Sequence, residues 1–266
     1  MQEHSKNTYN DFANHIFDMH DVHKKLIEGI NDYSKKSGIS RCVLGLSGGL
    51  DSAVVLKLAI DALGSENVTA LILPEKGVTN PQNTNHAKVL SDFLGVHYFP
   101  LSINGFLSSY SVIPWEPGNT AHMNTKARVR ANLLYNFANT YSALVFGTSN
   151  KSELLLGYGT KYGDLAADIM PIADLYKTEV MELADFMGLP REIIEKEPSA
   201  ELYEGQTDAE ELGGSYGEID PILARRDQGE VALIEKGMNA VLIRSIFRRI
   251  EANKHKLLGP HIIRVS

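Results

Sequence analysis

The sequence predicts an α/β fold with a doubly wound, mainly parallel sheet that carries helices on both faces. Two observations support this class. Short apolar runs alternate along the chain with longer segments whose apolar residues recur at helical spacing. Glycine or proline follows most of the short runs, which is typical of a buried strand that enters a turn. Because parallel neighbours need a crossover, usually a helix, this alternation favours a parallel sheet covered on both faces.

Each predicted element follows from its own residue pattern. Helices are expected at residues 12–36, 52–63, 84–94 and 126–139. Strands are expected at residues 41–46, 68–73, 96–101 and 143–147. Residues 175–266 are amphipathic and are expected to be mostly helical and to pack on the same core, which predicts a single domain over residues 1–266. In such a fold, ligands bind at the carboxyl ends of the strands.

The composition excludes several classes of protein. The chain of 266 residues has a net charge of −7, which disfavours nonspecific binding to nucleic acid. Its one cysteine, Cys42, rules out a disulfide within the chain and disfavours a cysteine-rich zinc site. The first residues are polar, and no apolar run approaches the length of a membrane span. We therefore expect a cytoplasmic protein with no membrane and no nucleic-acid partner.

A glycine-rich turn connects the first expected strand to the second expected helix. Glycines let the backbone approach an anion, and the free N–H groups at a helix start bind phosphate oxygens. Ser47 and Ser52 add hydroxyl donors, and Asp51 could hold Mg²⁺ against those oxygens. The pattern GxxxxGK[ST] is absent, so γ-phosphoryl transfer of that type is not implied. The candidate ATP-binding residues of this turn are Gly45, Leu46, Ser47, Gly48, Gly49, Leu50, Asp51 and Ser52.

The string SGGLDS in this position resembles the PP-loop of the ATP pyrophosphatases, which have an adenine nucleotide α-hydrolase-like fold. The resemblance implies cleavage of ATP to AMP and pyrophosphate, with the loop holding the pyrophosphate. A purely structural turn is one alternative, and a bare Gly-Gly would favour it. A tRNA-modifying PP-loop enzyme is a second alternative, but it calls for a basic face or reactive cysteines. A noncatalytic nucleotide sensor is a third, and it need not retain the other polar residues described below.

Seven later strings narrow the choice within that superfamily. They are residues 124–130 (NTKARVR), 147–153 (GTSNKSE), 160–164 (TKYGD), 175–178 (LYKT), 196–200 (KEPSA), 212–220 (LGGSYGEID) and 254–256 (KHK). In this order and spacing they resemble the ammonia-dependent NAD synthetases over residues 22–258. The resemblance implies a ligase of NAD biosynthesis that uses ATP as co-substrate, Mg²⁺ as cofactor, and deamido-NAD and ammonia as the other substrates. It also implies an acyl-adenylate intermediate and a homodimer with deamido-NAD near the subunit interface.

The resemblance assigns roles to individual residues. Asp51 and Glu153 are expected to ligate Mg²⁺, and their substitution to abolish turnover with little loss of stability. The implied catalytic residues are Asp51, Lys177 and Asp164, of which Asp164 would bind or deprotonate ammonium. Further ATP contacts are implied for Thr148, Lys177 and Ser199. Deamido-NAD contacts are implied for Arg128, Lys161, Asp168, His255 and Lys256.

Each of these residues also has a plain structural interpretation. A charged side chain on a helix is usually solvated, an acidic residue at a helix start complements the dipole, and surface ion pairs stabilise little. Because these residues occur together, at positions that match the motifs of the family, the functional interpretation is favoured. The sequence departs from the family pattern at two places. Tyr158, Gly159 and Leu165 differ from the usual residues, which changes the expected shape of the ammonia pocket. The loop at residues 74–81 also differs, which changes the expected contacts with adenine.

Free ammonia is the expected nitrogen donor unless another chain delivers it. The glutamine-using relatives carry a glutaminase domain with a cysteine nucleophile, whereas here only about forty residues precede the phosphate loop. Cys42 falls within a predicted buried strand, where a cysteine acts as a small hydrophobic residue. The sequence therefore predicts that no glutaminase domain is present.

Overall fold

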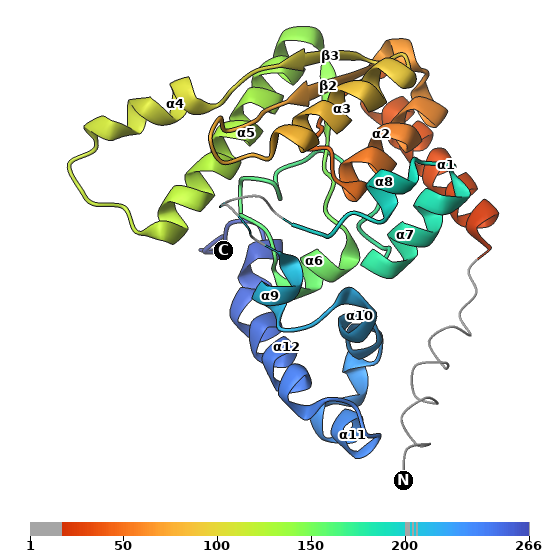
Figure 1. Cartoon of the computed structure of the whole chain (residues 1–266), viewed down its shortest axis with the longest axis vertical. Coiled ribbons are helices and arrows are strands. Elements are labelled where there is room, and N and C mark those ends of the chain that lie inside the picture. The colour runs from red at the N-terminus through yellow and green to blue at the C-terminus, as the bar shows by residue number, and fades with distance from the viewer. Residues whose placement is uncertain (1–17, 200–202, 204, 206, 266) are drawn as a thin grey trace.

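The sheet has four parallel strands in the order β3-β2-β1-β4 (Figure 1). The computed structural model describes residues 18–199, 203, 205 and 207–265. The strands are β1 (Arg41–Gly45), β2 (Val68–Ile72), β3 (His97–Pro100) and β4 (Ala143–Phe146). The chain moves from β1 outward to β3 and then returns to the other side of β1 for β4. This reversal creates a switch point between β1 and β4, which is where doubly wound folds bind ligands.

Helices cover both faces of the sheet, as predicted, because consecutive residues of a strand point to opposite faces. Cys42 and Leu44 of β1 belong to a hydrophobic cluster with α1, α2, α3, α7 and α8. Val43 belongs to a different cluster, formed with α5 on the opposite face. The bounds are α1 (Met19–Ser37), α2 (Leu50–Leu63), α3 (Pro81–Phe93), α5 (Asn119–Tyr141), α7 (Lys177–Phe186) and α8 (Arg191–Ile194). The predicted fold class is therefore confirmed.

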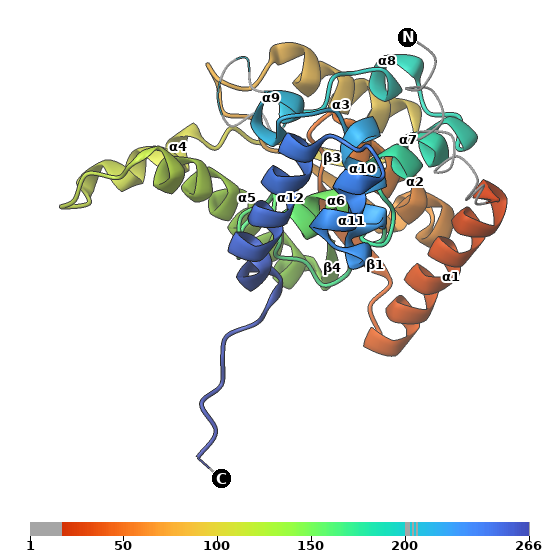
Figure 2. The same ribbon diagram turned by 90° about the horizontal axis from the view of Figure 1, so that it is seen from below.

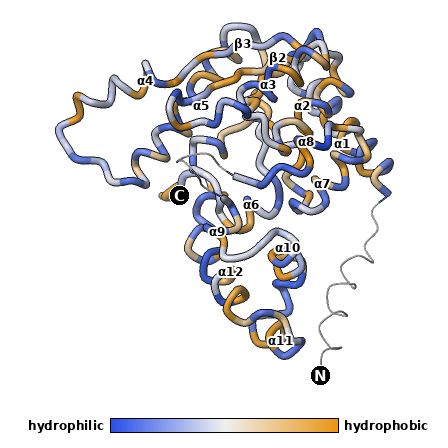
Figure 3. The backbone as a smooth tube through the Cα atoms, viewed as in Figure 1, coloured by the Kyte–Doolittle hydropathy of each residue, from blue (hydrophilic) through white to orange (hydrophobic). Residues whose placement is uncertain are grey.

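A third hydrophobic cluster joins the C-terminal helices to one another and to α6. Leu156 of α6 packs with residues of α9, α10, α11 and α12, and Tyr176 just before α7 takes part. Hydrophobic residues recur along α10, α11 and α12 (Figure 3). The bounds are α6 (Lys151–Leu156), α9 (Asp208–Leu212), α10 (Tyr216–Ala224), α11 (Glu230–Glu235) and α12 (Ala240–Asn253). The C-terminal third is mostly helical, as expected, while the single-domain interpretation of residues 1–266 stays a prediction.

The remaining helical segments are short. They are α4 (Asn104–Ser108) and the 3₁₀ turns η1 (Ser65–Asn67), η2 (Ser109–Val112), η3 (Arg226–Gln228) and η4 (Lys254–Leu257). None of the helices in the described part of the chain combines the length and apolar character needed to cross a membrane.

Several helices begin at other residues than the sequence predicted, and in two of them a side-chain cap marks the start. The predicted helix at 84–94 begins at Pro81, since the Asn80 side chain accepts a hydrogen bond from the backbone N–H of Gln82. The predicted helix at 126–139 begins at Asn119, in a polar stretch with no apolar periodicity. The first helix begins at Met19, after Asp18 as N-cap, and residues 12–17 of that prediction lie outside the described residues.

Candidate active site

The phosphate loop lies between β1 and α2, at the carboxyl edge of the sheet. Gly48 has φ of 81°, and a Cβ atom there would lie 2.2 Å from the carbonyl oxygen of Asn83, so only glycine fits. The hydroxyl oxygens of Ser47 and Ser52 lie 3.1 Å apart, and Ser47 Oγ accepts from the N–H of Gly49 at 3.1 Å. No side chain caps the start of α2 at Gly49, which leaves its first N–H groups available to an anion.

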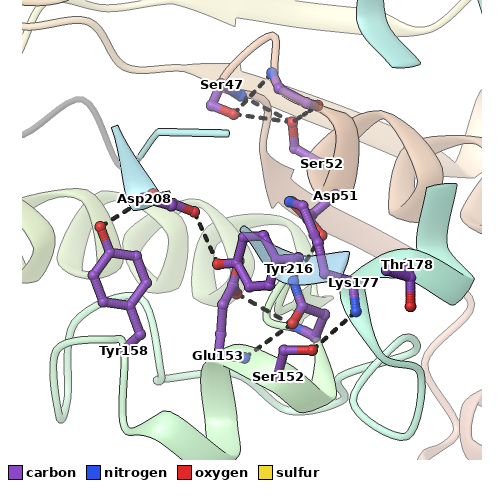
Figure 4. Close-up of polar contacts among 12 residues, drawn as sticks. Ser47, Asp51, Ser52, Ser152, Glu153, Tyr158, Lys177, Thr178, Asp208 and Tyr216 are labelled. Carbon is purple, nitrogen blue, oxygen red and sulfur yellow. Dashed lines mark hydrogen bonds and ion pairs between the residues drawn. The ribbon is translucent and has the colours of Figure 1, made fainter. Parts of the chain in front are cut away.

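A buried lysine and two carboxylates meet at the start of α2 (Figure 4). The Lys177 side chain is only 4 % exposed, and its Nζ atom forms an ion pair with Oδ2 of Asp51. Asn150 connects the two carboxylates: its Nδ2 donates to Oδ1 of Asp51 at 2.9 Å, and its backbone N–H donates to Oε2 of Glu153 at 3.3 Å. The structure therefore brings together Asp51, Glu153 and Lys177, as the sequence predicted.

Electrostatics at this point favour a cation. Burial raises the pKa of the Glu153 carboxyl well above its usual range, the Asp51 charge raises it further, and Lys177 opposes both effects. Burial lowers the pKa of Lys177, but the charges of Asp51 and Glu153 outweigh burial and leave that pKa raised. Two desolvated carboxylates side by side suit a divalent cation with oxygen ligands. Within the described residues no three of His, Cys, Asp and Glu cluster as a metal site.

A cavity of about 480 Å³ extends from the phosphate loop across the switch point, which is a volume typical of small-molecule sites. Thr148 lines it directly after β4, and Ser199 lines it from the segment that follows α8. All three predicted ATP contacts outside the loop, Thr148, Lys177 and Ser199, therefore face the same cavity as the loop. Asp164 and Lys256 line its other end.

Three of the residues predicted to bind deamido-NAD form one chain of contacts. The guanidinium group of Arg128 donates from Nε and Nη2 to the carbonyl oxygen of Lys161, at 3.3 Å each. Lys161 Nζ in turn donates to the carbonyl oxygen of His255 at 2.9 Å. Arg128 and His255 are both exposed, and Arg128, Lys161 and His255 are not among the residues that line the cavity.

Asp168 has a different environment. Its carboxylate accepts from the backbone N–H of Val145 at 2.7 Å and from the hydroxyl of Tyr135 at 3.3 Å, so it bridges β4 and α5. Its contact with deamido-NAD stays a prediction.

Comparison with known proteins agrees with this geometry. A profile of the NAD synthase family matches residues 22–260. The NH3-dependent NAD+ synthetase of Archaeoglobus fulgidus is 46 % identical over 91 % of this chain and 97 % of its own length. That of Methanocaldococcus jannaschii is 44 % identical, over 91 % of this chain and 96 % of its own length. The chain belongs to the NAD synthase family.

Solved structures of this family superimpose on the fold. The NH3-dependent NAD synthetase from Campylobacter jejuni has a TM-score of 0.81 at 34 % identity, covering 93 % of this chain and all of that one. An NMN synthetase from Francisella tularensis has a TM-score of 0.78 at 33 % identity, covering 92 % of this chain and all of that one. The glutamine-dependent NAD+ synthetase from Acinetobacter baumannii has a TM-score of 0.65 at 29 % identity. The match covers 92 % of this chain but only 47 % of that longer chain.

The region that departs from the family pattern packs around Asp164. The Asp164 carboxylate accepts from the N–H of Thr160 at 3.0 Å. Burial raises its pKa, against the opposing effects of the Thr160 hydrogen bonds and the Lys256 charge. A Cβ atom at position 159 would lie 2.7 Å from Leu165 Cδ2 and 2.8 Å from Asp164 Oδ2, so a larger residue there would displace these side chains. Leu165 therefore fills space beside the proposed ammonium residue of this NAD synthase family member.

Sequence reasoning missed several residues of the site. Asp208, only 4 % exposed, accepts from the hydroxyl groups of Tyr216 at 2.9 Å and Tyr158 at 3.1 Å. The Tyr216 ring centroid lies 5.6 Å from Lys177 Nζ (Figure 4). Lys196 reaches the phosphate loop, where its Nζ atom contacts the carbonyl oxygen of Gly48 at 3.3 Å.

Asn150 is the one missed residue with a signal in the sequence. Asparagine followed three residues later by glutamate is typical of a capping box, and both bonds of that box form at the start of α6. Tyr158 lies 50 positions from Asp208, and Gly48 lies 148 positions from Lys196, so no local pattern indicates these contacts.

Proposed function

We propose that this protein amidates deamido-NAD with ammonia at the expense of ATP, forming an acyl-adenylate and then NAD, AMP and pyrophosphate. The observation that carries the proposal is the meeting of Asp51, Glu153 and Lys177 at the start of α2. The cavity that they line also contains Asp164. The names of the relatives described above support the substrate class.

In the first step the carboxylate of deamido-NAD attacks the α-phosphorus of ATP, and the bond to the bridging oxygen of pyrophosphate breaks. The N–H groups at the start of α2 and the hydroxyls of Ser47 and Ser52 hold the departing pyrophosphate. Lys177 offsets negative charge at the phosphates. Asp51 and Glu153 would hold Mg²⁺, which would supply Lewis-acid stabilisation of the phosphate oxygens.

In the second step ammonia attacks the acyl carbon, and the carbon–oxygen bond to AMP breaks. Ammonium must first lose a proton, because its nitrogen has no free electron pair. Asp164 is the carboxylate proposed to bind ammonium and accept that proton. Its raised pKa suits such a base, since a carboxylate with a higher proton affinity accepts a proton more readily.

We further propose a homodimer formed through the edge strand β3 and the segment that contains α4 and η2. This segment projects from the body of the molecule (Figure 2). Large apolar side chains are exposed there, including Phe99 at 42 %, Tyr110 at 47 %, Trp115 at 65 % and Val112 at 83 %. An exposed apolar face beside a sheet edge is a feature of association surfaces. Light scattering should give a molar mass twice that of one chain, and the W115E substitution should lower that mass toward the value for one chain. A monomeric wild-type protein would contradict the proposal.

One assay tests the activity. Purified protein is incubated with ATP, Mg²⁺, deamido-NAD and ammonium, and NAD, AMP and pyrophosphate are quantified. We expect the three products in equal amounts, and glutamine should not replace ammonium. ADP as product, or no NAD from folded protein, would refute the proposal.

A parallel reaction with nicotinate mononucleotide identifies the acceptor, because one similar structure is described as an NMN synthetase. We expect the dinucleotide to be preferred, since the relatives with higher identity are NAD+ synthetases. A higher kcat/KM for the mononucleotide would correct the substrate but keep the amidation chemistry.

A further inference from the structure

Asp220 of α10 is a fully buried carboxylate that the proposed chemistry does not use. It has 0 % relative exposure. Its Oδ1 accepts from the hydroxyl of Ser152 at 2.5 Å. Its Oδ2 accepts from both the N–H and the hydroxyl of Thr178, each at 2.9 Å. Three donors therefore converge on one buried side chain from two different helices.

These donors offset the cost of burying the carboxylate. Thr178 N–H belongs to the first turn of α7, where backbone N–H groups have no partner within the helix and the helix dipole is positive. Burial raises the pKa of Asp220, whereas the hydrogen bonds from Ser152 and Thr178 and the charge of Lys177 lower it. An ionised Asp220 accepts all three hydrogen bonds without competition from a proton of its own.

The residues that Asp220 contacts are the sequence neighbours of the active-site pair. Ser152 precedes Glu153 in α6, and Thr178 follows Lys177 in α7. The Ser152 hydroxyl also accepts from the backbone N–H of Lys177 at 2.9 Å. The starts of α6 and α7 are thus tied to each other and to α10 through one hydroxyl and one carboxylate (Figure 4 shows Ser152, Lys177 and Thr178).

We propose that Asp220 is a positioning residue that aligns Glu153 and Lys177 for Mg²⁺ and ATP by holding together the starts of α6 and α7. It touches no substrate and acts through Ser152 and Thr178. The inference rests on the proposed function, since that function assigns Lys177 to ATP and Glu153 to the metal. Outer-shell partners of this kind typically change metal affinity or activity when they are replaced.

The test compares Asp220→Asn with Glu218→Gln. The two changes convert a carboxylate to an amide on the same helix. Glu218, however, accepts from the N–H and the hydroxyl of Ser215, which is the N-cap of α10 itself. Binding of ATP is measured by calorimetry at a fixed Mg²⁺ concentration without deamido-NAD, and thermal unfolding is followed in parallel. We expect D220N to weaken binding about 10- to 100-fold. We expect E218Q to bind as the wild type does.

A purely structural role would lower the unfolding temperature of D220N and leave its affinity unchanged, and that result would overturn the proposal. If D220N does not fold, Ser152→Ala decides, because it removes only the hydroxyl between Asp220 and Lys177. S152A should weaken binding, and in a folded D220N background it should add little further loss. A folded S152A with wild-type affinity would overturn the proposal.

The outcomes for the two proposals can be separated. A wild-type protein that binds ATP with Mg²⁺ but makes no NAD would refute the proposed reaction and leave the role of Asp220 to be decided by the variants. A wild-type protein that does not bind ATP with Mg²⁺ would refute both.

Discussion

Asp51→Asn separates the catalytic from the structural role of the ion pair at the start of α2. Lys177 is buried, and Asp51 is the carboxylate that its Nζ atom contacts. An asparagine keeps one acceptor oxygen, but its NH2 group must face a donor, either Lys177 Nζ or Asn150 Nδ2. The buried pair therefore changes the expectation from sequence that this substitution leaves stability nearly unaffected.

The size of the effect follows from these contacts. Leaving a buried donor without its partner costs about 1–3 kcal/mol. Complete loss of the partner of a buried charge costs about 3–5 kcal/mol, but Glu153 and Asp208 still act on Lys177 electrostatically and favour the lower range. We expect the free energy of unfolding of D51N, measured by urea denaturation, to fall by about 1–3 kcal/mol. NAD formation should fall at least about 100-fold, because a metal ligand is lost.

Asp61→Asn is the matched control. It lies on the same helix and also pairs with a lysine, Lys57, but in a partly exposed site. Such a pair contributes about 0–1 kcal/mol, and D61N should retain NAD formation. If D51N were as stable as D61N, the buried pair would not stabilise the fold, and if D51N retained turnover, the proposed metal site would be wrong.

Three further outcomes follow from the geometry. Gly48→Ala should abolish ATP binding measured by calorimetry while thermal unfolding remains cooperative, since its Cβ atom would lie 2.2 Å from a backbone oxygen in the phosphate loop. Cys42, 1 % exposed with its pKa raised by burial to about 12, should resist iodoacetamide at pH 8 until the protein unfolds, and rapid labelling of native protein would contradict this. The thiol has a pKa of about 8.5 in the unfolded chain and about 12 in the folded protein. Between these two pH values the unfolded state binds fewer protons than the folded state, so the free energy of unfolding falls as pH rises. Cys42→Ala should reduce that fall relative to the wild type in urea denaturation between about pH 9 and pH 11.

The sheet and its helices could be predicted because their signals are local. Val43 and Leu44 point to opposite faces of the sheet, and both are fully buried. Because both faces of β1 are covered, its sequence is a continuous apolar run, as expected for a strand of a parallel sheet. The phosphate loop was likewise predictable, since its residues are contiguous. The capped start of α3 at Pro81 and the polar start of α5 at Asn119 lie outside any apolar periodicity, which is why those boundaries were wrong.

The supporting residues of the site could not be predicted from local patterns because tertiary structure creates their contacts. Asn150 meets Asp51 across 99 positions of sequence, and Ser152 meets Asp220 across 68. Asparagine in a capping box and aspartate in an amphipathic helix each have an ordinary local explanation. Only the packing of α6, α7 and α10 shows that these polar groups share one buried network.

The pairing of Lys177 with Asp51 predicts that the proposed metal and the nucleotide would bind together. Three acidic residues, Asp51, Glu153 and Asp208, raise the pKa of the buried Lys177 ammonium group, at the place where ATP would bring further negative charge. A cation held by Asp51 and Glu153 would offset this negative charge and would leave Lys177 Nζ able to contact the phosphates. We therefore expect ATP to bind more weakly without Mg²⁺, because the carboxylates would then repel its phosphates.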